Sequence, residues 1–438
     1  MLALTCVSGT ILIRFYQVSD GAKGQIYLFK DVEWAYVQGM TQIDDAPIVR
    51  LKPKAAAKAI RHGFPWVYDN ELVLDRRTKA IEPGTIAQLQ DAERQFLGWA
   101  AFNPLSKIPA RVLDRDPQAV IYGDWIHRAV RHALDLRKMV FDAPYYRVIH
   151  AEADGFPGLI VDRFDDVFVV QPNAAWIERR LDHLVAALVE FGGAREVIKN
   201  ASGRARALEG LDDQNAVLLG DMPSAPLPVP MNGAVYMADV AGGQKTGLFY
   251  DQRPNHAVVK QIASGAQVLD VFSHVGGFSL AALAGGATQA MAVDGSAAAL
   301  DLAGQGAQAM GAAERFSTRR GDAFDVLTDL GEQGMTYDIV ICDPPAFAAS
   351  KPALEAGLRA YERVARLAAP LVKEGGVLVL CSCSHAADLH KFRTSCVRGI
   401  GRAGRAGALF HTGYAGMDHP LHSQLAESGY LKSLFFRL

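Results

Sequence analysis

The pattern of hydrophobic and polar positions changes near residue 228 and predicts different architectures on its two sides. Beyond that point, short apolar runs bounded by turn residues alternate with helical stretches. The expected strands are 268–271, 289–293, 315–319, 338–342 and 377–380, with helices such as 278–284 and 297–310 between them. This alternation is typical of a mostly parallel sheet with helices on both faces, so residues 228–438 should form an α/β domain.

Two smaller modules are expected before that domain. Residues 47–117 should be β-rich, with short strands at 48–51, 85–89, 96–102 and 108–113. Residues 118–227 should form an α+β module with helices at 122–140 and near 175–191 and strands at 147–150, 159–162, 167–170 and 196–199. We expect Arg204 and Arg206 to lie in a loop after the last of these strands.

The first 46 residues fit poorly with the rest of the chain. Residues 1–13 are mostly apolar, but they lack the positive leading region and the cleavage site of a signal peptide. Met40 stands just before a polar lead into the first expected strand. We therefore expect the natural start at Met40 and interpret residues 1–39 as upstream read-through.

Composition and charge set wider limits. A length of 438 residues favours two or three domains, and a hydrophobic content of 50% indicates a globular chain. The net charge of -2 does not indicate a nucleic-acid partner and does not exclude one, because binding depends on local patches. Five cysteines are too few for a disulfide framework, and no long apolar run occurs, so we expect a cytoplasmic protein without a membrane span.

Basic and aromatic residues are interleaved at the start of the β-rich module. Arg50, Lys52 and Lys54 precede Trp66 and Tyr68. Such a mixture can hold RNA through its phosphates and by stacking on its bases. Taken alone, it is more often a solvated helix face beside core aromatic rings, and both interpretations stay open.

A glycine loop marks a candidate cofactor site. The strand that ends near Asp270 is followed by Gly276 and Gly277, which open a helix and allow a ligand to approach the backbone closely. Asp294 ends the next strand, where a carboxylate can hold ribose hydroxyls. Asp322 follows the third strand and could accept from an adenine amino group or cap a helix. The nicotinamide fingerprint G-x-G-x-x-G is absent, which favours S-adenosylmethionine as the cofactor.

A rigid turn, Asp-Pro-Pro-Ala-Phe at 343–347, closes another buried strand. Its two prolines fix the backbone, and this would aim Asp343 into the crevice at the carboxyl ends of the strands. Asp343 could then bind the N3 and N4 edge of a cytosine, with Pro344 and Phe347 on the substrate side and Phe347 stacked on a flipped base. An ordinary turn is the alternative.

A thiol follows the strand 376–380. Attack of a thiolate on C6 of a pyrimidine makes C5 nucleophilic enough to accept a methyl group, after which a base removes the C5 proton. Cys383 is the candidate nucleophile, but Cys381 shares its side-chain direction, so periodicity does not separate them. Together with His385 and His390 they could instead bind zinc. The bare C-x-C spacing argues against that, and we expect no metal.

These motifs resemble those of the ribosomal RNA large subunit methyltransferase I family, which makes 5-methylcytosine in large-subunit rRNA. The resemblance covers residues 47–438. It lies in the segments 243–253, 272–278, 343–347, 382–384, 418–420 and 429–432. His274 and Val275 depart from the Tyr-Thr pair of the family, which would change cofactor contacts, and residues 1–39 have no counterpart.

The resemblance implies three domains and assigns roles to residues. Residues 47–117 would be a PUA RNA-binding domain, 118–227 a central α+β domain, and 228–438 a class I Rossmann-like methyltransferase domain. Cys383 takes the position of the family nucleophile, whereas Cys381 does not. The residues at positions that surround the S-adenosylmethionine cofactor in the family are Lys245, Thr246, Phe272, Gly277 and Asp294.

The sequence therefore predicts a cytoplasmic, S-adenosylmethionine-dependent RNA cytosine-C5 methyltransferase whose partner is large-subunit rRNA. A related family that methylates guanine N7 shares the glycine loop and the Asp-Pro-Pro turn but lacks the cysteine, so Cys383 favours cytosine. A second alternative is an RNA-binding assembly factor without turnover. The oligomeric state is not determined by the sequence, and a homodimer is left open.

Overall fold

The computed structural model describes residues 2–7, 10–15, 46–242 and 247–438, and it divides the chain into two compact units, 1–45 and 46–438. In the first unit, β1 (Leu2–Val7) pairs antiparallel with β2 (Thr10–Phe15). Met40, where we expect the natural start, lies outside the described residues. No helix in the described ranges is long and apolar enough to cross a membrane.

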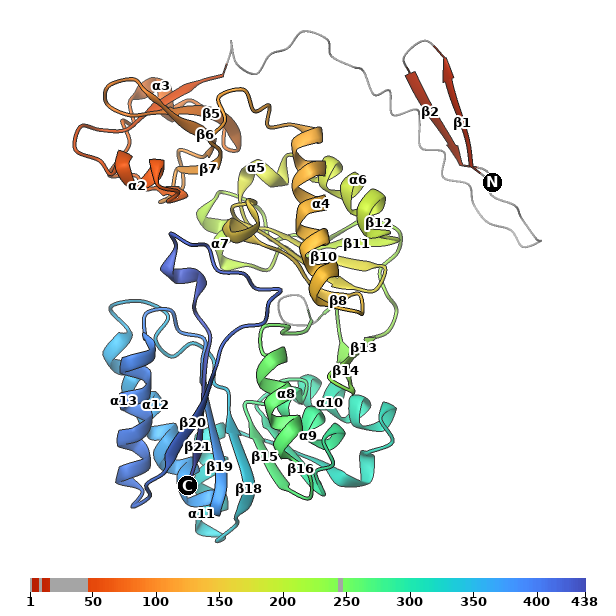
Figure 1. Cartoon of the computed structure of the whole chain (residues 1–438), viewed down its shortest axis with the longest axis vertical. Coiled ribbons are helices and arrows are strands. Elements are labelled where there is room, and N and C mark those ends of the chain that lie inside the picture. Colours follow the sequence, from red (N-terminus) through yellow and green to blue (C-terminus); the bar gives the residue numbers. More distant parts are fainter. Residues whose placement is uncertain (1, 8–9, 16–45, 243–246) are drawn as a thin grey trace. The chain divides into compact units, whose positions relative to one another are not determined.

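A seven-stranded sheet forms the centre of the C-terminal part (Figure 1). Its strands are β15 (Gln267–Val271), β16 (Gln289–Asp294), β17 (Phe316–Arg320), β18 (Tyr337–Cys342), β19 (Val372–Ser382), β20 (Ala408–Gly413) and β21 (Lys432–Arg437). Their order is β17-β16-β15-β18-β19-β21-β20, and β21 runs antiparallel to both of its neighbours. The expected mostly parallel sheet is confirmed, with β20 and β21 added at one edge.

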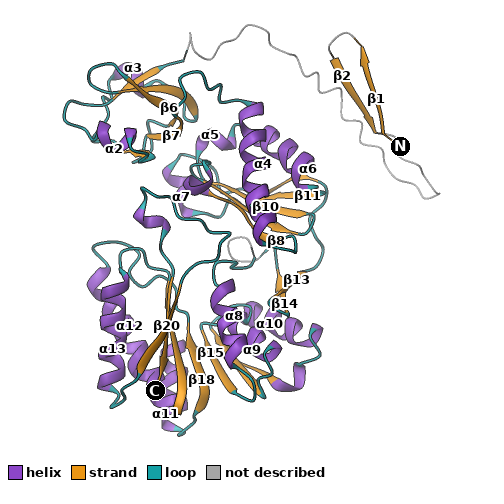
Figure 2. Ribbon diagram, viewed as in Figure 1, coloured by secondary structure: helices purple, strands orange, loops and turns teal. Residues whose placement is uncertain are grey.

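Helices cover both faces of this sheet (Figure 2). One face carries α8 (Arg253–Ile262), α9 (Gly277–Ala284) and α10 (Ala297–Ala309), and the other carries α11 (Ala323–Glu332), α12 (Leu354–Ala368) and α13 (Leu389–Arg402). Each face has its own core of buried aliphatic and aromatic residues. This two-sided burial explains why the central strands are almost continuously hydrophobic.

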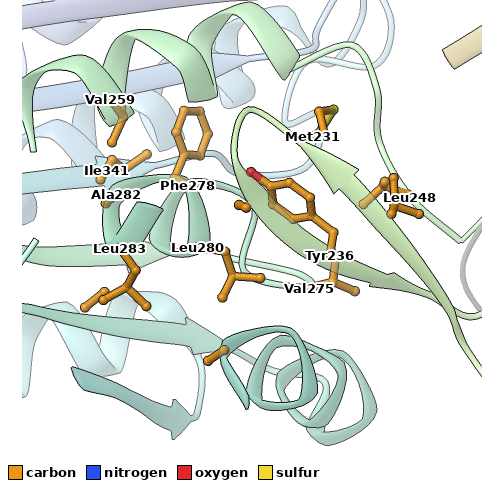
Figure 3. Packing of buried hydrophobic residues seen from close by; sticks show 14 of the residues in the cluster. Met231, Tyr236, Leu248, Val259, Val275, Phe278, Leu280, Ala282, Leu283 and Ile341 are labelled. Atoms are coloured by element: carbon orange, nitrogen blue, oxygen red, sulfur yellow. The ribbon is translucent and has the colours of Figure 1, made fainter. Parts of the chain in front are cut away.

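A β-hairpin completes the core on the α9 side. It consists of β13 (Leu227–Met231) and β14 (Ala234–Ala238). Figure 3 shows Tyr236 of this hairpin beside Phe278 and Leu280, and all three side chains are buried. The His256 ring packs edge-on against Phe278, with 4.5 Å between centroids. The hairpin therefore fixes the helix that begins at the end of the glycine loop.

The N-terminal module of the second unit is a five-stranded sheet in the order β3-β5-β6-β7-β4. Its elements are β3 (Ile48–Arg50), α2 (Ala57–Arg61), β4 (Trp66–Val67), α3 (Arg76–Lys79), β5 (Thr85–Gln90), β6 (Phe96–Phe102) and β7 (Ala110–Asp114). The four expected strands are present, and the two-residue strand β4 is added.

The central module contains a sheet in the order β12-β11-β10-β9-β8. Its elements are α4 (Gly123–Val140), β8 (Tyr145–His150), β9 (Leu159–Phe164), β10 (Val167–Pro172), α5 (Ala175–Glu178), α6 (Leu181–Gly192), β11 (Glu196–Lys199), α7 (Arg204–Leu208) and β12 (Ala216–Leu219). The central module also contains the 3₁₀ turn η1 (Ala151–Asp154). The other 3₁₀ turns belong to the C-terminal part and are η2 (Ala313–Arg315), η3 (Ala369–Leu371) and η4 (Ala426–Ser428).

The prediction of a loop at Arg204 and Arg206 is wrong, because this segment forms the helix α7. Arg206 is 1% exposed, and its guanidinium donates to Glu178 Oε2 at 2.8 Å and to the Pro172 carbonyl. A buried charge needs such partners. Arg206 therefore anchors the short helix inside the module.

Candidate active site

Three neighbouring strand ends define the candidate site. Val271 is paired with Cys342, and Cys342 with Leu380, in parallel register. From β15 the strand order runs outward through β16 and β17 on one side and through β18 and β19 on the other. The order therefore reverses between β15 and β18, and open α/β sheets bind ligands at the carboxyl ends of the strands at such a switch point. Phe272, Asp343 and Cys383 come directly after these strands and leave the sheet at the same edge.

The glycine loop has an unusual backbone. Phe272, His274 and Gly276 have φ values of 62°, 49° and 78°. Only glycine adopts this left-handed region without strain, so two strained residues here indicate a loop shaped for a ligand. Asp294 holds the loop in place, because its Oδ2 accepts from the His274 amide at 2.9 Å.

Asp270 lies directly beneath this loop. Its carboxylate is buried and accepts from both the amide and the hydroxyl of Ser279, at 2.9 and 2.8 Å. Burial raises the pKa of Asp270 to about 6. In the described parts of the chain, Oδ1 of Asp270 and the buried hydroxyl of Ser273 have no hydrogen-bond partner. Buried polar atoms of this kind are expected where a ligand completes the hydrogen bonds.

Asp343 is oriented by a side chain that the sequence analysis missed. Gln252 donates from Nε2 to Asp343 Oδ2 at 2.9 Å, and its own Oε1 accepts from Asn255 Nδ2 at 2.6 Å. The Asp343 amide donates to the Val271 carbonyl at 3.1 Å. Gln252 lies in the segment 243–253, but no local pattern assigns its side chain to a residue 91 positions away.

Burial separates the two cysteines that periodicity could not. Cys381 is 1% exposed, and the hydroxyl of Ser433 donates to its sulfur at 3.2 Å. Burial raises the pKa of the Cys381 thiol well above its ordinary value. Cys383 is partly exposed. Because the thiolate is the nucleophilic form, Cys383 is the more suitable of the two for covalent chemistry.

The segment around Cys383 is fixed from one side by hydroxyl groups. Ser382 and Ser384 are fully buried, and both share hydrogen bonds with the Tyr361 hydroxyl of α12, at 2.9 and 2.8 Å. The Ser384 hydroxyl also accepts from the Ala348 amide at 2.9 Å. Side chains alternate along an extended segment, so Cys383 should point away from this cluster.

A lysine also contacts this segment. Lys432 is paired with Ser382 in the antiparallel ladder, and its Nζ donates to the Ser384 and Ala387 carbonyls at 2.7 Å each. Burial lowers the pKa of Lys432 to about 8, while the charges of Cys383 and Asp388 act in the opposite direction. The site therefore places a cation beside the candidate nucleophile.

Comparison with known proteins agrees with this geometry. Residues 49–115 match a PUA-like domain family, and residues 203–394 match the S-adenosylmethionine-dependent methyltransferase family. A ribosomal RNA large subunit methyltransferase from Deinococcus radiodurans is 34% identical, covering 90% of this chain and 98% of that protein. The chain belongs to the ribosomal RNA large subunit methyltransferase I family. A member from Aliivibrio fischeri is 33% identical, covering 88% of this chain and 98% of its own length.

Solved structures show the same fold. A SAM-dependent methyltransferase from Streptococcus mutans has a TM-score of 0.75 and 20% identity, covering 90% of this chain and all of that one. A methyltransferase complexed with SAH has the same TM-score, with 21% identity and the same coverage. The predicted fold class is thus confirmed, and the chain is an S-adenosylmethionine-dependent methyltransferase.

The residues at the glycine loop fit this cofactor. Asp294 supplies carboxylate oxygens at the end of β16, and the Ser273 hydroxyl lacks a partner in the described chain. Phe272, Phe324 and Phe347 form an aromatic wall, with centroids 6.1 to 6.4 Å apart. Acceptor oxygens suit ribose hydroxyl and amino groups, and aromatic rings suit a purine. Lys245 and Thr246 lie outside the described residues.

Other predicted site residues have structural contacts of their own. Asp322 caps α11, with Oδ1 accepting from the Phe324 amide at 2.9 Å, so the alternative of a helix cap is realised. The Phe347 ring lies 5.1 Å from that of Tyr361, within the aromatic cluster. Pro344 is buried beside Asp343. The contact of Asp322 with adenine and the stacking of Phe347 on a base stay predictions.

The predicted RNA contacts are in the N-terminal module, at the end of β3 and just after it. Arg50 is half-buried and donates to Gln90 Oε1 at 3.2 Å, whereas Lys52 is exposed and donates to the Asn70 carbonyl at 2.9 Å. Lys54 is exposed. Their role in RNA binding stays a prediction. Among the residues that the structure describes, no three His, Cys, Asp or Glu side chains gather as a metal site would require.

Proposed function

We propose that this chain methylates C5 of a cytosine in large-subunit rRNA, in the cytoplasm, through a covalent bond between Cys383 and C6. The observation that carries the proposal is the partly exposed Cys383 at the carboxyl end of β19, in a segment held by the Tyr361 hydroxyl cluster and by Lys432. The similar proteins from D. radiodurans and A. fischeri are named as methyltransferases of large-subunit rRNA, which supports the substrate.

The geometry suggests a role for each residue. Asp343, oriented by Gln252, would bind the N3 and N4 edge of a cytosine flipped out of its stack. The Cys383 thiolate, favoured by the Lys432 cation, would add to C6 and make C5 nucleophilic. C5 then gains a methyl group, a base removes the C5 proton, and the bond between C6 and sulfur breaks. The cofactor, when bound, supplies an electrophilic methyl group.

We also propose the limits of the domains and the path of the RNA. The PUA domain would span 47–117, the central domain 118–227 and the methyltransferase domain 228–438, which agrees with three separate main sheets. RNA would contact Arg50 at the end of β3 and Lys52 and Lys54 just after it. Lys245 and Thr246 would contact the cofactor together with Phe272, Gly276, Gly277, Asp294 and Asp322.

The test is methyl transfer from labelled S-adenosylmethionine to large-subunit rRNA from a strain that lacks this gene, followed by nucleoside analysis. We expect 5-methylcytidine from the wild type and from Cys381→Ala, and none from Cys383→Ala. RNA that contains 5-fluorocytidine should trap a covalent complex, since fluorine at C5 prevents the final proton removal. Full activity of Cys383→Ala would refute the covalent mechanism, and 7-methylguanosine as the product would refute the base.

A further inference from the structure

A pocket of about 220 Å³ is lined by none of the residues that we assign to the cofactor. Its ring-bearing walls come from three parts of the chain: Trp66 of β4, His150 at the end of β8, and His422 and Tyr430 of the segment between β20 and β21. Glu152 of η1 also lines it. Pockets that enclose drug-sized ligands measure roughly 300–1,000 Å³, so this one suits a single planar ring system.

The walls of this pocket are held in place by hydrogen bonds. Trp66 donates from its indole nitrogen to Glu152 Oε1 at 2.8 Å, and Arg111 donates to the same oxygen at 3.2 Å. The Tyr430 ring lies 6.3 Å from the His150 ring at an angle of 35°. The indole and imidazole faces are therefore preorganised, as a stacking site for a nucleobase requires.

The lining of the pocket offers hydrogen-bond acceptors to a neutral ring. Burial is the main cause that lowers the pKa of His150, to about 2, and that of His422, so both imidazoles are neutral near pH 7. Glu152 and Glu427 are the acidic side chains that line the pocket. Carboxylates accept hydrogen bonds and repel anions. A neutral ring with an amino group can therefore donate hydrogen bonds to these carboxylates.

The pocket is linked to the proposed active site through Tyr430. Its hydroxyl donates to Asp251 Oδ2 at 2.7 Å, and Asp251 is followed by Gln252, which holds Asp343. Two residues after Tyr430, Lys432 holds the segment just beyond Cys383. An RNA strand with its target base beside Cys383 would thus bring a neighbouring nucleotide to this pocket.

We propose that this pocket binds a second, unmodified nucleobase of the substrate RNA, one that carries an exocyclic amino group. The inference rests on the proposed function, because it requires an RNA substrate. It gives Trp66 and His422 a role in positioning the strand, separate from the chemistry at Cys383.

Steady-state kinetics of Trp66→Ala and His422→Ala test the role of these rings. Loss of a stacking partner should raise KM for rRNA by about tenfold, with kcat and S-adenosylmethionine affinity nearly unchanged. Trp66→Phe is the matched control, because it keeps a ring and loses only the bond to Glu152, so its KM should rise clearly less than that of Trp66→Ala. Unchanged KM in both alanine variants would overturn the pocket while leaving the proposed function standing.

Ultraviolet crosslinking of the full chain to large-subunit rRNA tests binding without turnover. We expect adenine, cytosine or guanine adducts on the peptides that contain Trp66 or His422. Adducts found only on other peptides would overturn the pocket, and uracil adducts on these peptides would overturn the requirement for an amino group. A wild type that shows the expected adducts but forms no 5-methylcytidine would retain the pocket and refute the proposed reaction.

Discussion

Lys432 is a buried cation that interacts with the proposed nucleophile, Cys383. Its side chain is 4% exposed, and its pKa of about 8 leaves it cationic at pH 7 and neutral at higher pH. Tyr430 and Tyr361 also interact with Cys383, and Asp388 interacts with Lys432. Both tyrosines are neutral near pH 7, so Lys432 is the one of these three partners that carries a positive charge.

Lys432→Met should therefore make Cys383 less reactive near neutral pH. A neighbouring cation favours the thiolate, so its removal should shift the pH profile of iodoacetamide alkylation upward by about one unit. Alkylation of Cys383 would be followed by mass spectrometry of its peptide between pH 6 and 10. Lys432→Arg should keep the lower midpoint, because arginine stays protonated throughout this range. Identical profiles for the methionine variant and the wild type would contradict the role of Lys432.

Some site residues could be predicted from the sequence because local signals mark them. Asp343 stands in a rigid Asp-Pro-Pro turn, and Cys383 comes just after an apolar strand. Gln252 and Lys432 carry no such signal, since each acts on a residue brought near only by the fold. The choice between Cys381 and Cys383 likewise required burial, which alternation along one strand cannot supply.

At the scale of elements, the hydroxyl cluster joins α12 to the end of β19. Tyr361→Phe removes one hydroxyl that bonds two buried serines, and it should lower the free energy of unfolding by about 1–3 kcal/mol. Methyl transfer should fall as well, because Ser382 and Ser384 flank Cys383. Chemical denaturation and single-turnover rates would measure the two effects.

Tyr337→Phe is the matched control for this prediction. Tyr337 is also buried, at 6% exposed, but its hydroxyl makes only a 4.0 Å contact with the Met291 sulfur. Its loss should change the free energy of unfolding by less than about 0.5 kcal/mol. Equal effects of the two substitutions would show that the cluster does not stabilise the end of β19.

The elements that were predicted share strong local patterns. The parallel strands are short apolar runs between turn residues, and the structure places strands at all of them. The two antiparallel strands β20 and β21 were not foreseen, since Ala408–Gly413 is only partly buried and Lys432–Arg437 contains polar ends. The helix α7 was missed because its stability comes from the buried Arg206, a tertiary contact that local propensity does not encode.

At the scale of the whole second unit, a buried arginine connects the central module to the C-terminal part. Arg137 is fully buried in α4, and its guanidinium forms a two-bond pair with Asp154, at 2.5 and 2.8 Å. It also donates to the Asp418 carbonyl at 2.9 Å, and Asp418 in turn accepts from the Arg147 amide at 3.1 Å. Arg137 thus serves the interior of the unit and not its surface.

Arg137→Leu should destabilise the unit strongly, because it leaves the Asp154 carboxylate buried without its partner. Breaking a buried pair in this way lowers the free energy of unfolding by about 3–5 kcal/mol, which chemical denaturation would detect. Arg128→Leu on the exposed face of the same helix should change stability by less than about 0.5 kcal/mol. If the two variants were equally stable, Arg137 would not be joining the modules. A loss confined to Arg137→Leu would show that this buried pair stabilises the junction between the central module and the C-terminal part.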